Sequence, residues 1–246
     1  MKKYLQFSTV LFVVATIAFG VIEIITGDFN KGLLPVPAFV PGRTILAYSS
    51  GIIFVLLGSS LLVKRWRATA SFSIIIVYLI YFVFLHLVKL SADIYDGGEW
   101  TATFELLLLC SGAIFLTVIN TPADSRSKRL LTIGRYAFAI SLVVFAVLHF
   151  KYAEYISTLI PAWVPAKLFL AYFIGVGFLL TAISIIINVL AGLSTGLIGC
   201  MFLVWVIILH APRALVSPHS EPEWTSLFVA LASGGTSLMC SYLSKK

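Results

Sequence analysis

The chain has 246 residues, of which 60% are hydrophobic and 11% are charged, and its mean hydropathy is +1.05. A soluble globule of this size needs more polar surface, so the composition excludes a soluble protein and indicates one that lies in a lipid bilayer. The formal net charge is +7, but the basic residues stand in short groups between apolar runs. They therefore indicate membrane topology, and no nucleic-acid partner is expected.

Eight apolar segments follow one another along the chain, each long enough to cross a hydrocarbon layer of about 30 Å. We expect transmembrane helices near residues 4–27, 43–63, 68–90, 100–120, 130–152, 167–190, 197–215 and 224–243. The first run follows Met-Lys-Lys and could pass for a signal peptide. Its motif FGVIEI is echoed 126 positions later by FAVLHF, so we expect a retained helix. Residues 123–129 are expected as a polar linker and residues 192–196 as a tight turn.

One twelve-residue motif occurs twice. PAFVPGRTILAY at residues 37–48 returns as PAWVPAKLFLAY at residues 161–172, an offset of 124 in a chain of 246. Such self-similarity predicts a tandem duplication. We therefore predict an all-α membrane bundle of two four-helix repeats, residues 1–122 and 123–246, in one membrane domain. Each repeat crosses the membrane an even number of times, so the two repeats are expected to be parallel.

Several polar residues recur with the same offset of 124. The matched pairs are His86 and His210, Lys89 and Arg213, Glu99 and Glu223, and Trp100 and Trp224. Most lysines and arginines fall on the side of the chain ends, and short cytoplasmic loops retain positive charge. We therefore expect a multi-pass inner-membrane protein with both termini in the cytoplasm. The proline motifs and the matched polar pairs then face outward.

Ionisable residues inside a membrane span are candidate functional groups, because burying one costs on the order of 2–3 kcal/mol. Five fall within the expected helices, near the outer surface: Glu23, His86, Glu105, His149 and His210. A histidine beside a carboxylate can accept and return a proton, as quinol oxidation requires. The alternative is that these residues only form hydrogen bonds between helices.

We predict an outer-leaflet binding pocket with a charged rim. The candidate pocket residues are Glu23, His86, His149, His210, Tyr48 and Tyr172. The candidate rim residues are Arg43, Glu99, Lys167 and Glu223. The alternative for the acidic pair is that each glutamate complements a helix dipole beside an interfacial tryptophan. The alternative for the basic pair is that each side chain extends to the headgroups or pairs with an acid such as Glu23.

Metal and thiol chemistry have weaker support. Two matched histidines in a bundle are compatible with bis-histidine haem, but such pairs are common without metal, so we do not expect haem. No Cys or His pair has the spacing of zinc ligands. The three cysteines, Cys110, Cys200 and Cys240, lie in apolar runs without a CxxC motif, which indicates small buried side chains rather than a disulfide framework.

Two stretches carry a resemblance to a known family. They contain His149-Phe150, residues 160–165 with the sequence IPAWVP, residues 209–213 with the sequence LHAPR, and Glu223-Trp224-Thr225. This pattern resembles the DoxX-like integral membrane proteins, in the second half more closely than in the first. The resemblance implies a compact four-helix membrane unit, here doubled, and a link to respiratory or sulfur redox chemistry. These stretches are not catalytic motifs, so no catalytic residue is assigned.

The resemblance and the ionisable residues together predict a membrane subunit, or quinone-facing partner, of an oxidoreductase, with quinone as the candidate cofactor. Two other functions fit the same residues. The chain could bind or transport a small amphipathic solute or lipid, since parallel repeats also suit transporters. It could instead be a structural membrane subunit without a ligand.

Overall fold

The computed structural model describes residues 2–244, which contain helices and no strand. The helices are α1 (Lys2–Thr26), α2 (Arg43–Ser60), α3 (Arg67–Tyr81), α4 (Leu87–Ala92), α5 (Gly97–Asn120), α6 (Ser125–Lys151), α7 (Ala153–Leu159), α8 (Lys167–Ile187), α9 (Ala191–Trp205), α10 (Ala211–Val216) and α11 (Glu221–Leu243). Two π-helical turns, η1 (Phe82–His86) and η2 (Val206–His210), join α3 to α4 and α9 to α10. Within the described residues, eight helical spans are long and apolar enough to cross a membrane. The prediction of an all-α, multi-pass membrane bundle is confirmed.

Two helix boundaries differ from the sequence-based expectation by five or more residues. The expected linker is already helical from Ser125, because the Asp124 side chain accepts a hydrogen bond from the Ser127 amide at 2.7 Å and caps α6. The expected turn at residues 192–196 belongs to α9. The chain turns earlier, at Asn188 and Leu190, which both have positive φ. Asparagine is one of the few residues that adopt this conformation readily, so it ends α8.

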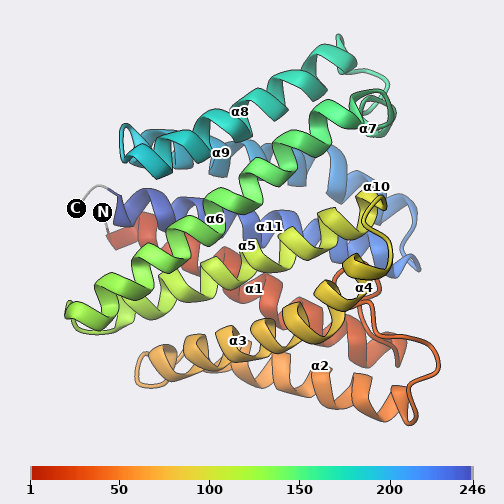
Figure 1. Ribbon diagram of the computed structural model, residues 1–246. Coiled ribbons are helices and arrows are strands. Elements are labelled where there is room, and N and C mark those ends of the chain that lie inside the picture. Colours follow the sequence, from red (N-terminus) through yellow and green to blue (C-terminus); the bar gives the residue numbers. More distant parts are fainter. Residues whose placement is uncertain (1, 245–246) are drawn as a thin grey trace.

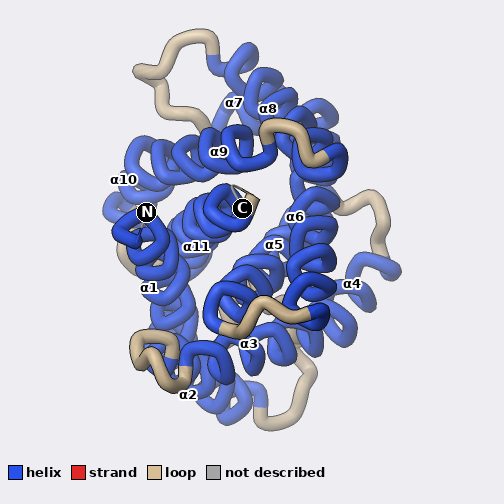
Figure 2. Tube along the Cα trace, turned by 90° about the vertical axis from the view of Figure 1, so that its left-hand side faces the viewer, coloured by secondary structure: helices blue, strands red, loops and turns tan. Residues whose placement is uncertain are grey.

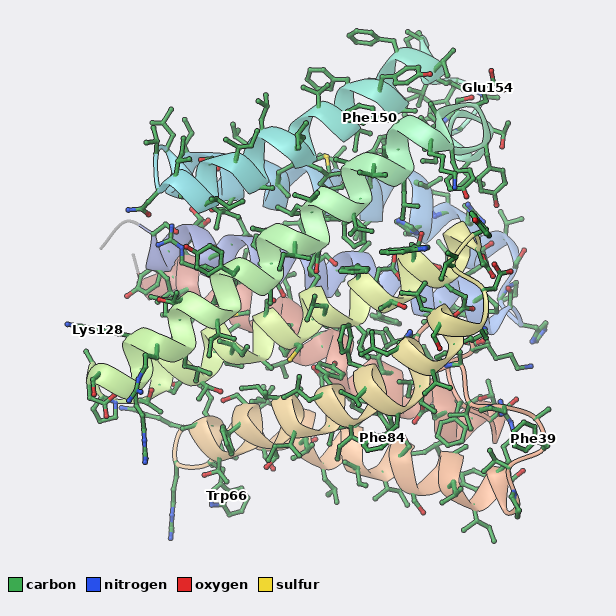
Figure 3. All side chains as sticks on the ribbon, in the orientation of Figure 1. Phe39, Trp66, Phe84, Lys128, Phe150 and Glu154 are labelled. Carbon is green, nitrogen blue, oxygen red and sulfur yellow. The ribbon has the colours of Figure 1, made fainter. Side chains whose placement is uncertain are left out.

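The helices run between two ends of the molecule (Figure 1). The start of α1 and the end of α11 lie at one end, which we call the terminal end, and α4, α7 and α10 lie at the other, which we call the distal end. Figure 3 shows Trp66 and Lys128 at the terminal end and Phe39 and Glu154 at the distal end. The start of α1 and the end of α11 therefore lie on one side of any membrane that the bundle spans.

Seen along the helices, the molecule is a ring with α5 and α11 on the inside (Figure 2). The two inner helices pack against each other, and their spans are the most buried of the eight. The main packing pairs have counterparts one half further along the chain. Helix α1 packs on α2 and α11, and α6 packs on α8 and α5; likewise α3 packs on α5, and α9 packs on α11.

Small residues allow the outer helices to approach closely, as is common in membrane proteins. A Cβ atom added at Gly51 of α2 would lie 2.7 Å from the backbone oxygen of Gly20 and 3.2 Å from Glu23 Cβ of α1. The residue 124 positions later, Gly175 of α8, has the same role. A Cβ atom added there would lie 3.0 Å from His149 Cβ of α6. Glu23 and His149 thus occupy corresponding places in the two halves.

Helix boundaries also recur along the chain. The elements α2, α3, η1, α4 and α5 each begin 124 residues before α8, α9, η2, α10 and α11. The two π-helical turns both end on a histidine, His86 and His210. Single π-helical turns are rare and often mark functional sites. The tandem duplication, with repeats 1–122 and 123–246, stays a prediction.

Candidate functional site

A cavity of about 580 Å³ opens at the distal end, between helices of the second half and α5 of the first half. Its walls come from α5, α6, α7, α8, α9, η2 and α11, and most of the residues that line it are apolar. We call it the distal cavity. Its size is typical of sites for small molecules, which occupy about 300–1,000 Å³ and combine apolar walls with a few polar groups.

Four aromatic side chains form one wall of the distal cavity. Phe178 lies at the centre of this wall, with its ring centroid 5.7 Å from that of Phe145 and 5.7 Å from that of Phe202. Trp205 continues the wall toward η2. The His149 ring meets Phe178 edge to face at 5.1 Å. This wall offers a broad apolar surface to a flat or hydrocarbon group.

Three ionisable side chains line the same cavity: Glu105 of α5, His149 of α6 and His210 of η2. His149 Nδ1 lies 2.8 Å from the Phe145 carbonyl oxygen. A carbonyl oxygen only accepts hydrogen bonds, so Nδ1 is the donor, and Nε2 of the neutral ring is left as an acceptor. Glu105 and His210 form no hydrogen bond or ion pair within residues 2–244. The distal cavity thus presents polar atoms that a bound molecule can satisfy.

The corresponding residues of the first half lie elsewhere and already have partners. Glu23 and His86 are fully buried and do not line the distal cavity. Glu23 Oε1 accepts hydrogen bonds from the Asn30 side chain at 3.3 Å and the Asn30 amide at 3.4 Å. His86 Nε2 lies 2.7 Å from the Leu33 carbonyl oxygen. The structure therefore does not bring Glu23, His86, His149 and His210 into one cavity.

The predicted tyrosines do not line the distal cavity either. Tyr48 is 41% exposed and Tyr172 is 44% exposed on the outside of the bundle. The Tyr172 ring stacks on Phe150 with a centroid separation of 6.4 Å. The aromatic residues that do line the cavity are Phe145, Phe178, Phe202, Trp205, Tyr152 and Tyr155, none of which was predicted as a pocket residue.

The acidic rim residues form two matched ion pairs near the distal end. Lys89 Nζ contacts Glu99 Oε1, and Arg213 Nη2 lies 2.7 Å from Glu223 Oε1. The adjoining tryptophans also match. Trp100 Nε1 donates to the Ile94 carbonyl oxygen at 2.8 Å, and Trp224 Nε1 donates to the Pro218 carbonyl oxygen at 3.0 Å, again 124 positions apart. Neither glutamate lines the distal cavity.

The two basic rim residues, Arg43 and Lys167, differ in their surroundings. Arg43 pairs with Asp28 at 2.7 Å and donates to the Val36 carbonyl oxygen, so its acidic partner is Asp28 and not Glu23. Burial by itself raises the pKa of Asp28, but the Phe29 amide and the Arg43 guanidinium outweigh it and hold that pKa below its usual value. Lys167 is half-buried at the start of α8 and does not line the cavity.

Metal ligation finds no support in the described part of the chain. No group of three or more His, Cys, Asp or Glu residues there is arranged to hold a metal ion. The histidines of the distal cavity instead stand among aromatic and aliphatic side chains. This setting suits hydrogen bonding to an organic molecule.

Comparisons with known proteins place no further constraint on the site, because no family model, curated protein or solved structure matches the chain. The fold and the cavity define the protein as an all-helical, multi-pass membrane protein with an amphipathic cavity at its distal end.

Proposed function

We propose that the protein binds a membrane-soluble quinone in the distal cavity and acts as the membrane subunit, or quinone-facing partner, of an oxidoreductase. The observation that carries this proposal is the meeting of Glu105, His149 and His210 in one apolar, aromatic-walled cavity. The resemblance to DoxX-like proteins, the two-repeat organisation and an inner-membrane location with cytoplasmic termini belong to the same proposal. With that orientation, the distal cavity opens in the outer leaflet.

The chemistry of a quinol fits the polar atoms of the cavity. A quinol that is oxidised releases two protons and two electrons. His149 Nε2, which accepts hydrogen bonds when the ring is neutral, and Glu105 can take up the protons. The electrons pass to a redox group of the partner oxidoreductase. The aromatic wall holds the ring and the start of the isoprenoid tail.

A second candidate is a hydrophobic amine that the protein binds or transports. It is favoured by one observation: Glu105 is the only acidic residue among those lining the cavity, and no lysine or arginine lines it. A carboxylate beside aromatic rings recognises an ammonium group through charge and cation–π attraction. A neutral quinone and a cationic amine thus make opposite demands on Glu105.

Extraction of bound molecules tests both candidates. The protein is purified in mild detergent, its visible spectrum is recorded, and the extract is analysed by mass spectrometry. Wild-type protein should carry a quinone, and the amount should fall in His149→Ala but persist in Glu105→Gln, whose neutral side chain still forms hydrogen bonds. A bound amine should instead be lost in Glu105→Gln. The control is Glu154→Gln, at an exposed position of α7. An extract with an amine and no quinone would select the second candidate. An extract with neither would leave a structural membrane subunit as the remaining function.

A further inference from the structure

The loop between α1 and α2 folds into the first half of the bundle. We call residues 29–36 the inner segment. Phe29 is 5% exposed, and Asn30, Leu33 and Leu34 are fully buried in the core. In the second half, the stretch between the corresponding motifs contains α7 (Ala153–Leu159) and its C-cap Ile160, at the wall of the distal cavity. The two halves therefore use the same stretch of chain in different ways.

Three polar residues of the surrounding helices bind the inner segment. Glu23 Oε1 accepts from the Asn30 side chain at 3.3 Å, and the Thr225 hydroxyl lies 3.5 Å from Asn30 Oδ1. His86 Nε2 lies 2.7 Å from the Leu33 carbonyl oxygen. These contacts come from α1, α11 and η1, so the segment lies where the three elements meet.

Each of these three residues has a counterpart that lines the distal cavity. His210 stands 124 positions after His86, and Thr101 stands 124 positions before Thr225. His149 corresponds to Glu23, because the two residues occupy the same place beside Gly175 and Gly51, which are themselves 124 positions apart. The aromatic wall recurs too: Phe145, Phe178 and Phe202 correspond to Phe19, Phe54 and Tyr78, which are fully buried, as Leu33 and Leu34 are. The polar groups that bind the inner segment therefore have counterparts that line an open cavity.

We infer that the inner segment occupies, in the first half, the place that corresponds to the ligand's place in the distal cavity. The ligand should therefore resemble the segment chemically, with a carbonyl oxygen that accepts a hydrogen bond from His210 and an apolar body that packs on Phe178 and Phe202. This inference rests on the proposed binding function of the distal cavity and assigns the ligand's chemical class. A quinone belongs to that class, and an amine without a carbonyl group does not.

The hydrogen bond in the first half shows how the histidine would act. The Leu33 carbonyl oxygen can only accept, so His86 Nε2 donates. Nδ1 of the neutral ring is then an acceptor, and the Thr103 hydroxyl lies 3.4 Å from it. The residue 124 positions after Thr103 is Leu227. His210 therefore has no matching hydroxyl to orient its ring, and its donor role depends on the ligand.

Three probes of matched design test the inference. The first is a short-chain naphthoquinone, the second is decanamide, and the third is decylamine, which has the same chain as the amide without the carbonyl. Each is added to wild-type protein in nanodiscs, and binding is measured by native mass spectrometry. Isotope-edited infrared spectra of ¹³C-carbonyl-labelled quinone and amide report the hydrogen bond, since donation to a carbonyl oxygen lowers its stretching frequency.

Three variants complete the experiment: His210→Ala, His210→Gln and His219→Ala. Loss of one neutral hydrogen bond should weaken binding of both carbonyl probes about three- to ten-fold in His210→Ala. The infrared shift should vanish in that variant and return in His210→Gln, whose side-chain amide donates. His219 lies in an exposed loop, so its variant is the control and should match wild type.

The outcomes separate this inference from the proposed function. Binding of decanamide that depends on His210, without binding of the quinone, would support the carbonyl subsite and reject the quinone function. Quinone binding with an unchanged carbonyl band in His210→Ala would reject the subsite and leave the quinone function standing. The inference is also overturned if neither carbonyl probe binds, or if decylamine binds as tightly as decanamide.

Discussion

Glu105→Val should stabilise the protein and weaken ligand binding at the same time. The substitution places in α5 the residue type that α11 has at the corresponding position, Val229, 124 residues later. Glu105 forms no hydrogen bond or ion pair within residues 2–244, and it lines an apolar cavity. Placing such a polar group in an apolar setting costs about 1–3 kcal/mol in measured protein variants. The free energy of unfolding of Glu105→Val should therefore rise by about that amount.

Unfolding in detergent micelles, followed by far-UV circular dichroism, measures the change in stability, and native mass spectrometry measures the bound ligand. Glu154→Val is the matched control, because Glu154 is exposed on α7 and its replacement should change stability by no more than about 0.5 kcal/mol. A Glu105→Val protein that is less stable than wild type would contradict the statement that the Glu105 carboxyl group destabilises the fold. It would mean that the carboxyl group has a structural role and is not held for a ligand.

Three further predictions concern the fold. Leu34→Ala should lower the free energy of unfolding by about 2–5 kcal/mol, because Leu34 is fully buried, whereas Leu56→Ala, 60% exposed on α2, should cost much less in the same unfolding assay. Gly20→Ala should lower the free energy of unfolding by about 1–3 kcal/mol, since its Cβ atom would lie 2.3 Å from a backbone oxygen of α2. Gly177→Ala is the control, because its Cβ atom would have its nearest neighbour at 3.7 Å. Equal stabilities of the two variants would contradict the close packing of α1 on α2. The pKa of Asp28 is lowered in the folded protein, so its carboxylate contributes stability above the unfolded pKa of about 3.9 and loses it as the pH falls through the folded value. Asp28→Asn should flatten this acid-side decline in an unfolding series below about pH 5, and an unchanged pH profile would count against the ion pair.

The eight membrane spans could be predicted from the sequence because apolar length alone decides them. The matched pairs also led to real features, including the ion pairs of Glu99 and Glu223 and the π-helical turns that carry His86 and His210. Matched residues start the same helices and form the same local ion pairs and turns, so a repeat in the sequence transfers well to local structure. It does not transfer to tertiary surroundings, since His86 is buried and His210 lines a cavity. Boundaries set by a single cap, such as Asp124 before α6, were missed.

The residues expected to line a single pocket lie in two separate places, and this separation could not be predicted from the sequence. His86 is buried against the inner segment, whereas His210 lines the distal cavity, so the two histidines belong to separate places. What the pattern could not show is that the inner segment folds inward while α7 stays at the wall. At the offset of 126 that pairs Glu23 with His149, Leu33 and Leu34 correspond to Leu159 and Ile160, so the two loops have equally apolar residues there. Their composition therefore did not reveal that one stretch folds inward and the other forms a short helix.

Quinone binding in the distal cavity is measured most directly by an anomalous difference map from crystals grown with a brominated short-chain naphthoquinone. We predict one bromine site per chain, in the distal cavity beside Phe178 and Phe202, with a quinone oxygen within hydrogen-bonding distance of His210. Bromine found only on the lipid-facing surface, or in the first half in place of the inner segment, would contradict it.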